Sequence, residues 1–488
     1  MTQQLQSDVV IVAGGTAGLT AAVVAAESGC TVIVCEKSGH TGGCGNMASG
    51  LLAVESRYQK QMQLPITREE VFEYHMTYAH WRADARLVRA YLDRSAGTID
   101  WLEGMGVEFM AVESHGPGNK YTWHIVKAPQ KFGTCRVMMD ILAEKAAQAG
   151  VQILLNTTVT SVLREGGKIT GVTATGTDGE DIQVRGKAVI IATGGIYDNP
   201  AMIKEHTGFE VGRDLILRTR KGASGDGLRM AWEAGAARTQ VIMHFMQQSA
   251  LLGPATSAAF LQPNLVVNLL GERFMNEEVI TSNNMFAGNA IALQKDKCAF
   301  SIIDEATKNH YVETGYDFET GYGVATWGAH VKADSFDAEM RPAAAGGTEG
   351  AYIAGSVAEL AAMTGIDRAG LERTLSEYNL ACDTGRDLLF DRKARYLRAV
   401  RQAPLYARKF FLDAFGSLGG IKINYRTEVL DTSGDIIPGL YAAGADAEAI
   451  YGDTYPISLP GSTMGFAVNS GRMAGENAAA YARAAGSV

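Results

Sequence analysis

The residues with the clearest chemical potential stand near the N-terminus, in Ala13-Gly14-Gly15-Thr16-Ala17-Gly18, directly after the apolar run 8–12. Their spacing follows G-x-G-x-x-G, with alanine in the first place and Gly15 and Gly18 in the other two. Small residues at such a turn let a pyrophosphate approach the backbone amides at the start of the next helix, where the helix dipole favours anions. Because alanine tolerates a tight turn without strain only at a negative φ, we expect Ala13 to adopt one.

A single acidic residue, Glu36, ends the next apolar run, eighteen residues beyond Gly18. At that place a carboxylate can accept hydrogen bonds from both hydroxyls of an adenosine ribose, and it would repel a 2′-phosphate. The alternative is a solvated charge at the end of a strand. The order of apolar run, glycine turn, helix, apolar run and acid favours a dinucleotide other than NADP.

The elements that must position these residues can be read from periodicity. Two short β-branched runs, 8–12 and 31–35, are typical of buried parallel strands, and the alanine-rich segment between them ends in glycine. Residues 67–105 read as amphipathic helices opened by a Thr67-x-x-Glu70 capping box, and residues 136–149 read as a helix. Strands joined by glycine-rich turns follow over 151–195.

The middle of the chain, 241–416, is less regular and contains one clear helix pair over 356–382. Strand character returns at 439–444, and a helix near 463–485 closes the chain. We therefore expect an α/β protein (α+β overall) in which residues 1–240 and 417–488 form one nucleotide-binding domain. Residues 241–416 would be a second domain inserted into it.

The composition excludes several classes of protein. Over 488 residues, 47% are apolar and 20% are charged, and the net charge of −9 gives no basis for a nucleic-acid partner. Glycines interrupt the uncharged stretch 9–26, and no secretory signal is visible, so we expect no membrane span and a cytoplasmic location. His40 and Cys44 have no second ligand pair nearby, which argues against a metal site.

The segment after Glu36, "KSGHTGGCGNMASG", is too glycine-rich for a regular helix and suits backbone contact with a large cofactor. Together with "AVIIATGG" (188–195), "GASGDGLRMAWEAGAA" (222–237), "GERFMNE" (271–277), "LERTLSEYN" (371–379) and "PGLYAAG" (438–444), it makes the whole chain resemble one superfamily. This is the superfamily of FAD flavoproteins that includes fumarate reductase, succinate dehydrogenase and 3-ketosteroid dehydrogenase. The resemblance implies a Rossmann-like FAD-binding domain with an inserted capping domain, and an active site between the two.

The resemblance also implies which residues hold FAD. The acid Glu36 would bind the ribose, and Gly42, Gly43, Ala48, Ser49 and Gly50 would wrap the pyrophosphate and ribityl chain. The full set expected to bind the cofactor is Ala13, Gly14, Gly15, Thr16, Ala17, Gly18, Glu36, Lys37, Gly42, Gly43, Cys44, Met47, Ala48, Ser49, Gly50, Val159, Ala192, Thr193, Gly194, Gly195, Asp226, Gly444, Ala445, Asp446, Ser458, Leu459, Gly461, Ser462 and Thr463. In succinate dehydrogenases a histidine of this loop is joined to FAD, and here Cys44 falls at that place. We expect non-covalent FAD, with a cysteinyl link as the alternative.

Members of this superfamily move a hydride between flavin N5 and a carbon of a C=C or CH–CH unit next to a carbonyl or carboxylate. In the fumarate reductase branch an arginine of a "G-x-R-F-x-N-E" segment is the proton donor, and Arg273 corresponds to it. Because the pKa of an arginine side chain is so high, an arginine can donate a proton only when a nearby carboxylate resupplies that proton. The alternative for Arg273 is a structural ion pair with Glu277 or Glu278.

The anchors that fumarate reductases use for a dicarboxylate are missing here. Gln247-Gln248-Ser249 stands where their "H-P-T" element would fall, although His244 lies three residues before it. Phe415 and Gly416 precede Gly419-Gly420 where a second histidine is usual, and Ser458 stands in place of the clamping arginine. Burying a dicarboxylate without cationic partners costs several kcal/mol, so fumarate and succinate are excluded as substrates.

Aromatic and neutral residues take the place of these anchors. We expect Tyr455 to donate to a carbonyl, as the tyrosine of "Y-P-G-P-G" does in ketosteroid dehydrogenases, and Tyr451, Ser458 and Gln247 to line the same pocket. This composition predicts a hydride-transferring ene-reductase or dehydrogenase for a small, largely apolar enone or enoate, working with a separate electron donor or acceptor. The alternatives are a flavoprotein subunit of a larger electron-transfer complex and a non-catalytic flavin-binding protein.

Overall fold

A computed structural model gives the structure of the chain and describes residues 2–115, 118–130, 132–218, 222–249, 252–322 and 325–485. Within these residues, an eight-stranded sheet carries the glycine-rich turn at one edge. Neighbouring strands follow the order β18, β19, β9, β1, β2, β6. In addition, β8 pairs with β9, and β7 pairs with β8. The strands are β1 (Gln3–Val12), β2 (Val32–Cys35), β6 (Gln152–Leu154), β7 (Thr158–Glu165), β8 (Lys168–Thr175), β9 (Asp181–Ile191), β18 (Glu428–Leu430) and β19 (Ile436–Ala442).

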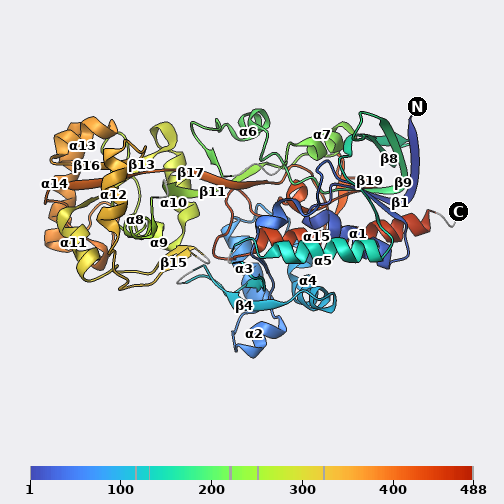
Figure 1. Cartoon of the computed structure of the whole chain (residues 1–488), viewed down its shortest axis with the longest axis horizontal. Coiled ribbons are helices and arrows are strands. Elements are labelled where there is room, and N and C mark those ends of the chain that lie inside the picture. The colour runs from blue at the N-terminus through green and yellow to red at the C-terminus, as the bar shows by residue number, and fades with distance from the viewer. Residues whose placement is uncertain are drawn as a thin grey trace.

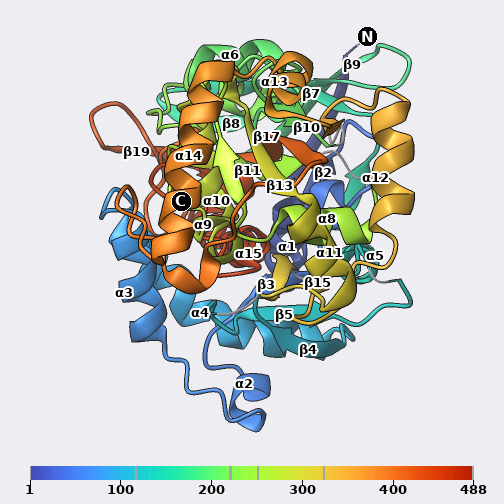
Figure 2. The same cartoon turned by 90° about the vertical axis from the view of Figure 1, so that its left-hand side faces the viewer.

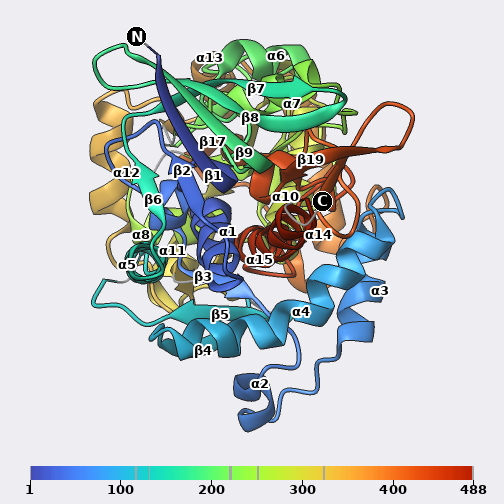
Figure 3. The same cartoon turned by 90° about the vertical axis from the view of Figure 1, so that its right-hand side faces the viewer.

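The centre of this sheet is parallel, because β1 pairs in parallel with β2 and β9, and β9 does so with β19. Strand β9 thus lies between β1 and β19, so that segments from the two ends of the chain share one sheet, as Figure 3 shows. Val9 and Ile11 belong to one apolar core and Val10 and Val12 to another, so β1 is buried on both faces. This confirms the predicted β-α-β unit and the α/β fold class.

Helices α1 (Thr16–Glu27), α5 (Cys135–Gln148) and α15 (Ser462–Ala484) lie against this sheet (Figure 3). Two glycines of α15 allow α1 to approach closely. A Cβ at Gly471 would lie 2.5 Å from the Ala17 carbonyl oxygen, and one at Gly475 would lie 2.7 Å from that of Ala21. The N-termini of α1 and α15 are thereby fixed at the same edge of the sheet.

A second, six-stranded sheet is built around the long strand β17, which pairs with β10, β11, β13 and β16. Its strands are β10 (Ile216–Leu217), β11 (Ile242–Ser249), β12 (Leu265–Val267), β13 (Ala299–Asp304), β16 (Ala351–Ala354) and β17 (Leu405–Leu418). Helices gather around its far end (Figures 1 and 2): α8 (Pro254–Phe260), α9 (Val279–Ser282), α10 (Asn284–Ala292), α11 (Glu305–Glu313), α12 (Phe336–Ala345), α13 (Val357–Thr364) and α14 (Arg368–Thr384). The boundaries at 240/241 and 416/417 stay predictions.

A smaller layer flanks the first sheet (Figure 1). It contains the three-stranded sheet of β3 (Gly50–Leu52), β5 (Trp123–Val126) and β4 (Phe109–Glu113). Helices α2 (Arg57–Gln61), α3 (Arg68–Tyr78) and α4 (Ala85–Gly104) accompany it, while α6 (Pro200–Thr207) and α7 (Asp226–Glu233) lie on the other side of the molecule. A two-stranded sheet pairs β14 (Thr320–Tyr322) with β15 (Ala325–Trp327).

Several predicted elements appear as expected. The segment 67–105 divides into α3 and α4, and the Thr67 hydroxyl accepts a hydrogen bond from the Glu70 amide. Helices α13 and α14 form the predicted pair. The description of 241–416 as irregular is wrong for its last part, because β17 is the central strand of the second sheet. None of the helices in the described ranges has the length and apolar character needed to cross a membrane.

Candidate active site

The glycine-rich turn differs from expectation at its first residue, because Ala13 has a φ of +82°. Two hydrogen bonds hold it there: its own amide donates to the Cys35 carbonyl (2.8 Å), and the next amide, of Gly14, donates to Glu36 Oε2 (2.7 Å). An alanine in this left-handed region costs about 1 kcal/mol relative to glycine. The expected negative φ is therefore wrong, and the surrounding bonds override the preference of the side chain.

Gly18 is required by the approach of α1 to the same turn. A Cβ on Gly18 would lie 1.9 Å from the Ala13 carbonyl oxygen, whereas a Cβ on Gly15 would meet nothing within 4 Å. The space at Gly15 opens at the N-terminus of α1, where exposed amides favour a phosphate.

Glu36 is 7% exposed, and both of its carboxylate oxygens accept hydrogen bonds from the backbone. Oε2 binds the Gly14 amide, and Oε1 binds the Ser38 amide at 2.8 Å. A carboxylate offers about four lone-pair positions, so two remain for hydroxyl groups of a ligand. This residue links the turn to the end of β2.

A cleft of about 870 Å³ opens at this edge of the sheet, within the ~300–1,000 Å³ range of small-molecule and cofactor sites. Of the residues expected to bind the cofactor, the following line it: Ala13, Gly15, Thr16, Ala17, Glu36, Lys37, Gly43, Cys44, Met47, Val159, Ala192, Thr193, Gly194, Asp226, Gly444 and Ala445. They come from six separate segments of the chain. The amides of α1, the small residues and the acid at β2 fit a flavin adenine dinucleotide.

Other expected residues do not line this cleft, namely Gly14, Gly18, Gly42, Ala48, Ser49, Gly50, Gly195, Asp446, Ser458, Leu459, Gly461, Ser462 and Thr463. Some of these support its walls. A Cβ at Gly50 would lie 2.3 Å from the His124 carbonyl oxygen, and one at Gly461 would lie 2.6 Å from the Leu52 amide nitrogen. These two glycines allow β3 to pack against its neighbours.

Asp446 also has a supporting position. It is fully buried, and its carboxylate accepts hydrogen bonds from the amides of Thr193, Gly194 and Gly195 and from the Thr193 hydroxyl. Burial raises the pKa of Asp446, and these hydrogen bonds lower it. Instead of contacting the cleft, it fixes the turn after β9.

Sequence reasoning did not select several residues that line the cleft, among them Ser38, His40, Thr41, Arg136 and Asp140. Arg136 and Asp140 lie one turn apart at the start of α5, on the face opposite its buried residues. Those charges at the start of the helix were the signal that could have identified them.

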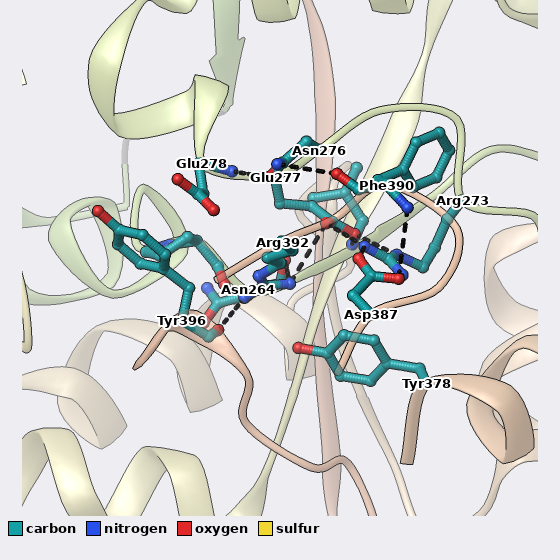
Figure 4. Close-up of polar contacts among 12 residues, drawn as sticks. Asn264, Arg273, Asn276, Glu277, Glu278, Tyr378, Asp387, Phe390, Arg392 and Tyr396 are labelled. Atoms are coloured by element: carbon teal, nitrogen blue, oxygen red, sulfur yellow. Dashed lines mark hydrogen bonds and ion pairs between the residues drawn. The ribbon is translucent and has the colours of Figure 1, made fainter. Parts of the chain in front are cut away.

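The structure places Arg273, the expected proton donor, in a buried cluster of ion pairs, and its part in proton transfer stays a prediction (Figure 4). Its side chain is 4% exposed and forms bidentate ion pairs with Glu277 (2.8 and 2.7 Å) and Asp387 (3.1 and 2.8 Å). Burial lowers the pKa of Arg273, but the hydrogen bonds to both carboxylates raise it above its ordinary value. Arg273 lines a separate cavity along α14, and the ion-pair alternative describes it.

Tyr455 lies at the centre of a cluster of rings. Its ring stacks on His244 with centroids 3.9 Å apart, His244 lies 5.7 Å from Phe415, and Tyr451 meets Tyr455 edge-on at 5.3 Å. Arg218 lies with its guanidinium 5.4 Å from the Phe415 ring and is ion-paired with Asp413. The wall next to Tyr455 is therefore aromatic, and its nearby guanidinium is neutralised.

The Tyr455 hydroxyl lies at the N-terminus of α15. Burial and the nearby Glu448 raise the pKa of Tyr455, while hydrogen bonds from the Ser462 and Thr463 amides and the Thr463 side chain lower it. Burial outweighs these bonds, so the pKa of Tyr455 lies above its ordinary value and the phenol keeps its proton.

The other three expected catalytic residues are buried as well. Tyr451 is 1% exposed and its hydroxyl donates to Glu448 Oε1 at 2.5 Å, so it is engaged with an acid that sequence reasoning did not select. Ser458 is 6% exposed, and its carbonyl accepts from the Lys120 amide. Gln247 is fully buried, and its side-chain amide has no hydrogen-bond partner among the described residues.

A parallel sheet with a glycine turn, an acid at the end of β2 and a dinucleotide-sized cleft are the features of a flavin-dependent oxidoreductase. Comparison with known proteins gives the family: the model described as "FAD binding domain" matches residues 8–461, and the chain belongs to that family. The predictions of an FAD enzyme and of this superfamily are confirmed.

Two kinds of relative are notable. The chain is 37% identical over 487 residues to vinyl phenol reductase of Lactiplantibacillus plantarum, covering 97% of this chain and 96% of that protein. Its structure is similar to the open conformation of a flavocytochrome c3 fumarate reductase (TM-score 0.70, 26% identity, 98% of this chain and 79% of that one). The fold is also that of 3-ketosteroid-Δ4-(5α)-dehydrogenase from Rhodococcus jostii RHA1 (TM-score 0.76, 23% identity, 97% of each chain).

Proposed function

We propose that this chain reduces the C=C bond of a small, uncharged alkene conjugated to an aromatic ring or a ketone, of which a vinyl phenol is the model. The single observation that carries the proposal is the aromatic wall formed by Tyr455, His244 and Phe415. A flat conjugated substrate packs well against such rings. A dicarboxylate would find Arg218 already paired with Asp413 and would stay uncompensated.

Bound FAD supplies the hydride in this reaction. The residues of the cleft hold its dinucleotide part, with Glu36 at the ribose and the start of α1 at the pyrophosphate. Tyr455 gives a proton to the substrate carbon that does not receive the hydride. The Ser462 and Thr463 amides stabilise the phenolate that results.

The test is anaerobic reoxidation of the photoreduced protein by a panel of acceptors, followed by flavin absorbance. We expect a vinyl phenol, or a cyclic enone of similar size, to reoxidise the flavin at least about tenfold faster than fumarate, equivalent to ~1.4 kcal/mol of discrimination. Faster reoxidation by fumarate would contradict the proposal. A lack of reaction with every acceptor would instead support a non-catalytic flavin protein.

FAD is held without a covalent bond in this proposal, and a separate electron donor regenerates its reduced form. Whether FAD is covalently bound depends on Cys44, which is exposed and lines the cleft. After acid precipitation we expect the yellow colour in the supernatant. A yellow pellet that becomes colourless in Cys44→Ser would establish the cysteinyl link instead.

A further inference from the structure

Glu448 is a buried acid that neither the cofactor cleft nor the wall beside Tyr455 accounts for. It follows the short helix η4 (Gly444–Ala447), is 2% exposed, and accepts the Tyr451 hydroxyl at 2.5 Å. Burial raises the pKa of Glu448 well above its ordinary value, and the hydrogen bond from Tyr451 lowers it only in part. Burial therefore favours the protonated form of this carboxyl group, the form that can act as an acid.

On its outer side, Glu448 borders a cavity of about 230 Å³. Polar residues line the same cavity, namely Arg82, Asp84, Thr239, Gln240 and Lys422. Arg82 is about half exposed and bonds Asp453 and Gln240, so this wall reaches the surface. The volume admits several water molecules, each with polar partners. Water can thus bring protons to Glu448 from the solvent.

On its inner side, Glu448 is connected towards Tyr455. The Tyr451 hydroxyl lies 3.0 Å from Ser462 Oγ, and the amide of the same Ser462 bonds the Tyr455 oxygen. His75 fixes this loop from the side: its Nε2 lies 2.6 Å from the Ile450 carbonyl, and its ring packs 5.6 Å from that of Tyr451. The Tyr451 and Ser462 hydroxyl groups therefore lead from a solvent-facing cavity to the start of α15, where the Ser462 amide faces the phenol of Tyr455.

We propose that Glu448, Tyr451 and Ser462 form a relay that returns a proton to Tyr455 after each turnover. This proposal rests on the proposed function. When Tyr455 protonates the substrate, its O–H bond breaks and a C–H bond forms, leaving a phenolate. Ser462 Oγ then gives its proton to that phenolate, Tyr451 replaces it, and Glu448 replaces the proton of Tyr451. The Glu448 carboxylate takes a new proton from water in the cavity, so one solvent proton enters the product for each hydride.

In this relay Glu448 and Tyr451 supply protons. Substitutions can distinguish that role from a purely structural one. Glu448→Gln keeps the acceptor for Tyr451 but cannot release a proton, and Tyr451→Phe breaks the connection. Tyr91→Phe is the matched control, because the Tyr91 hydroxyl bonds the Ser462 carbonyl (3.1 Å) without touching Glu448. Each holoprotein is photoreduced and then reoxidised over several turnovers by 4-vinylphenol with a continuous supply of a dithionite-type donor, in H₂O and D₂O.

We expect Glu448→Gln and Tyr451→Phe to lower the steady-state rate about tenfold and to increase the solvent isotope effect, in line with the loss of a proton-transfer step. Flavin content and reoxidation by O₂ should be unchanged, and Tyr91→Phe should behave as wild type. The infrared difference between wild type and Glu448→Gln at neutral pH should contain the C=O band of a protonated carboxyl that shifts in D₂O.

Two results overturn the relay while leaving the proposed function in place. They are the absence of that infrared band, and alkene turnover by Glu448→Gln and Tyr451→Phe within twofold of wild type. An equal loss of O₂ reoxidation and alkene turnover would also overturn it, because it would indicate a structural role. A wild-type protein that no alkene reoxidises overturns both proposals.

Discussion

Replacing Gly18 by alanine is expected to weaken FAD binding roughly 100-fold, because the new Cβ would lie 1.9 Å from the Ala13 carbonyl oxygen. That oxygen belongs to the backbone of the turn, so relief requires α1 to move away from the sheet. The movement would displace the amides at the helix N-terminus, which bind the pyrophosphate, from the cleft. Titration of the apoprotein with FAD, followed by quenching of flavin fluorescence, measures the effect.

Gly97→Ala is the matched control for this substitution. Gly97 also lies inside a helix, α4, but a Cβ there would meet nothing within 4 Å. We expect Gly97→Ala to keep wild-type affinity and to gain up to about 1 kcal/mol in the free energy of unfolding. A Gly18→Ala protein with wild-type affinity for FAD would show that the turn does not position the cofactor.

Replacing Arg273 by alanine is expected to lower the free energy of unfolding by about 3–5 kcal/mol, because it leaves the carboxylates of Glu277 and Asp387 buried without their cation. Both are at most 2% exposed, and the more distant Arg392, at 3.3 Å, and the Val266 amide, at 3.4 Å, compensate Glu277 only in part. Urea unfolding followed by circular dichroism measures this loss. The turnover of the folded fraction, expressed per bound flavin, should stay close to wild type.

Two further variants make this result decisive. Arg273→Lys keeps the charge but cannot form both bidentate pairs, so we expect a smaller loss of stability. Arg373→Ala removes an exposed arginine whose pair with Glu272 spans 3.7 Å, and it should change stability by less than about 1 kcal/mol. A stable Arg273→Ala protein that has lost alkene reduction would restore the proton-donor assignment.

The two substitutions concern different kinds of information in the chain. The glycine turn, the acid at the end of β2 and the helix that follows the turn are encoded over short distances by residue type and period. These local signals predicted the dinucleotide site, and the family resemblance located the cleft residues that come from later segments of the chain. The helix pair α13 and α14 followed from the same kind of periodicity.

Local signals were insufficient where a property depends on distant partners. The ion pair of Arg273 with Glu277, four residues later, can be expected from the sequence. Its second partner, Asp387, is 114 residues away and cannot. The positive φ of Ala13 follows from bonds to Cys35 and Glu36, which only the neighbouring strand provides. Strand β17 was missed because its partners come from four separate segments.

The sequence by itself determined the dinucleotide site, because that site depends on residue types at short, fixed spacings, and its dispersed motifs carried the resemblance that implied FAD and the class of reaction. The tertiary structure decided which polar side chains could serve the reaction, because burial and hydrogen-bond partners set the charge that a side chain carries. Glu448 shows the difference most clearly: in the sequence it is one acid among small residues, and in the fold it is a buried acid with a raised pKa between a cavity and Tyr451.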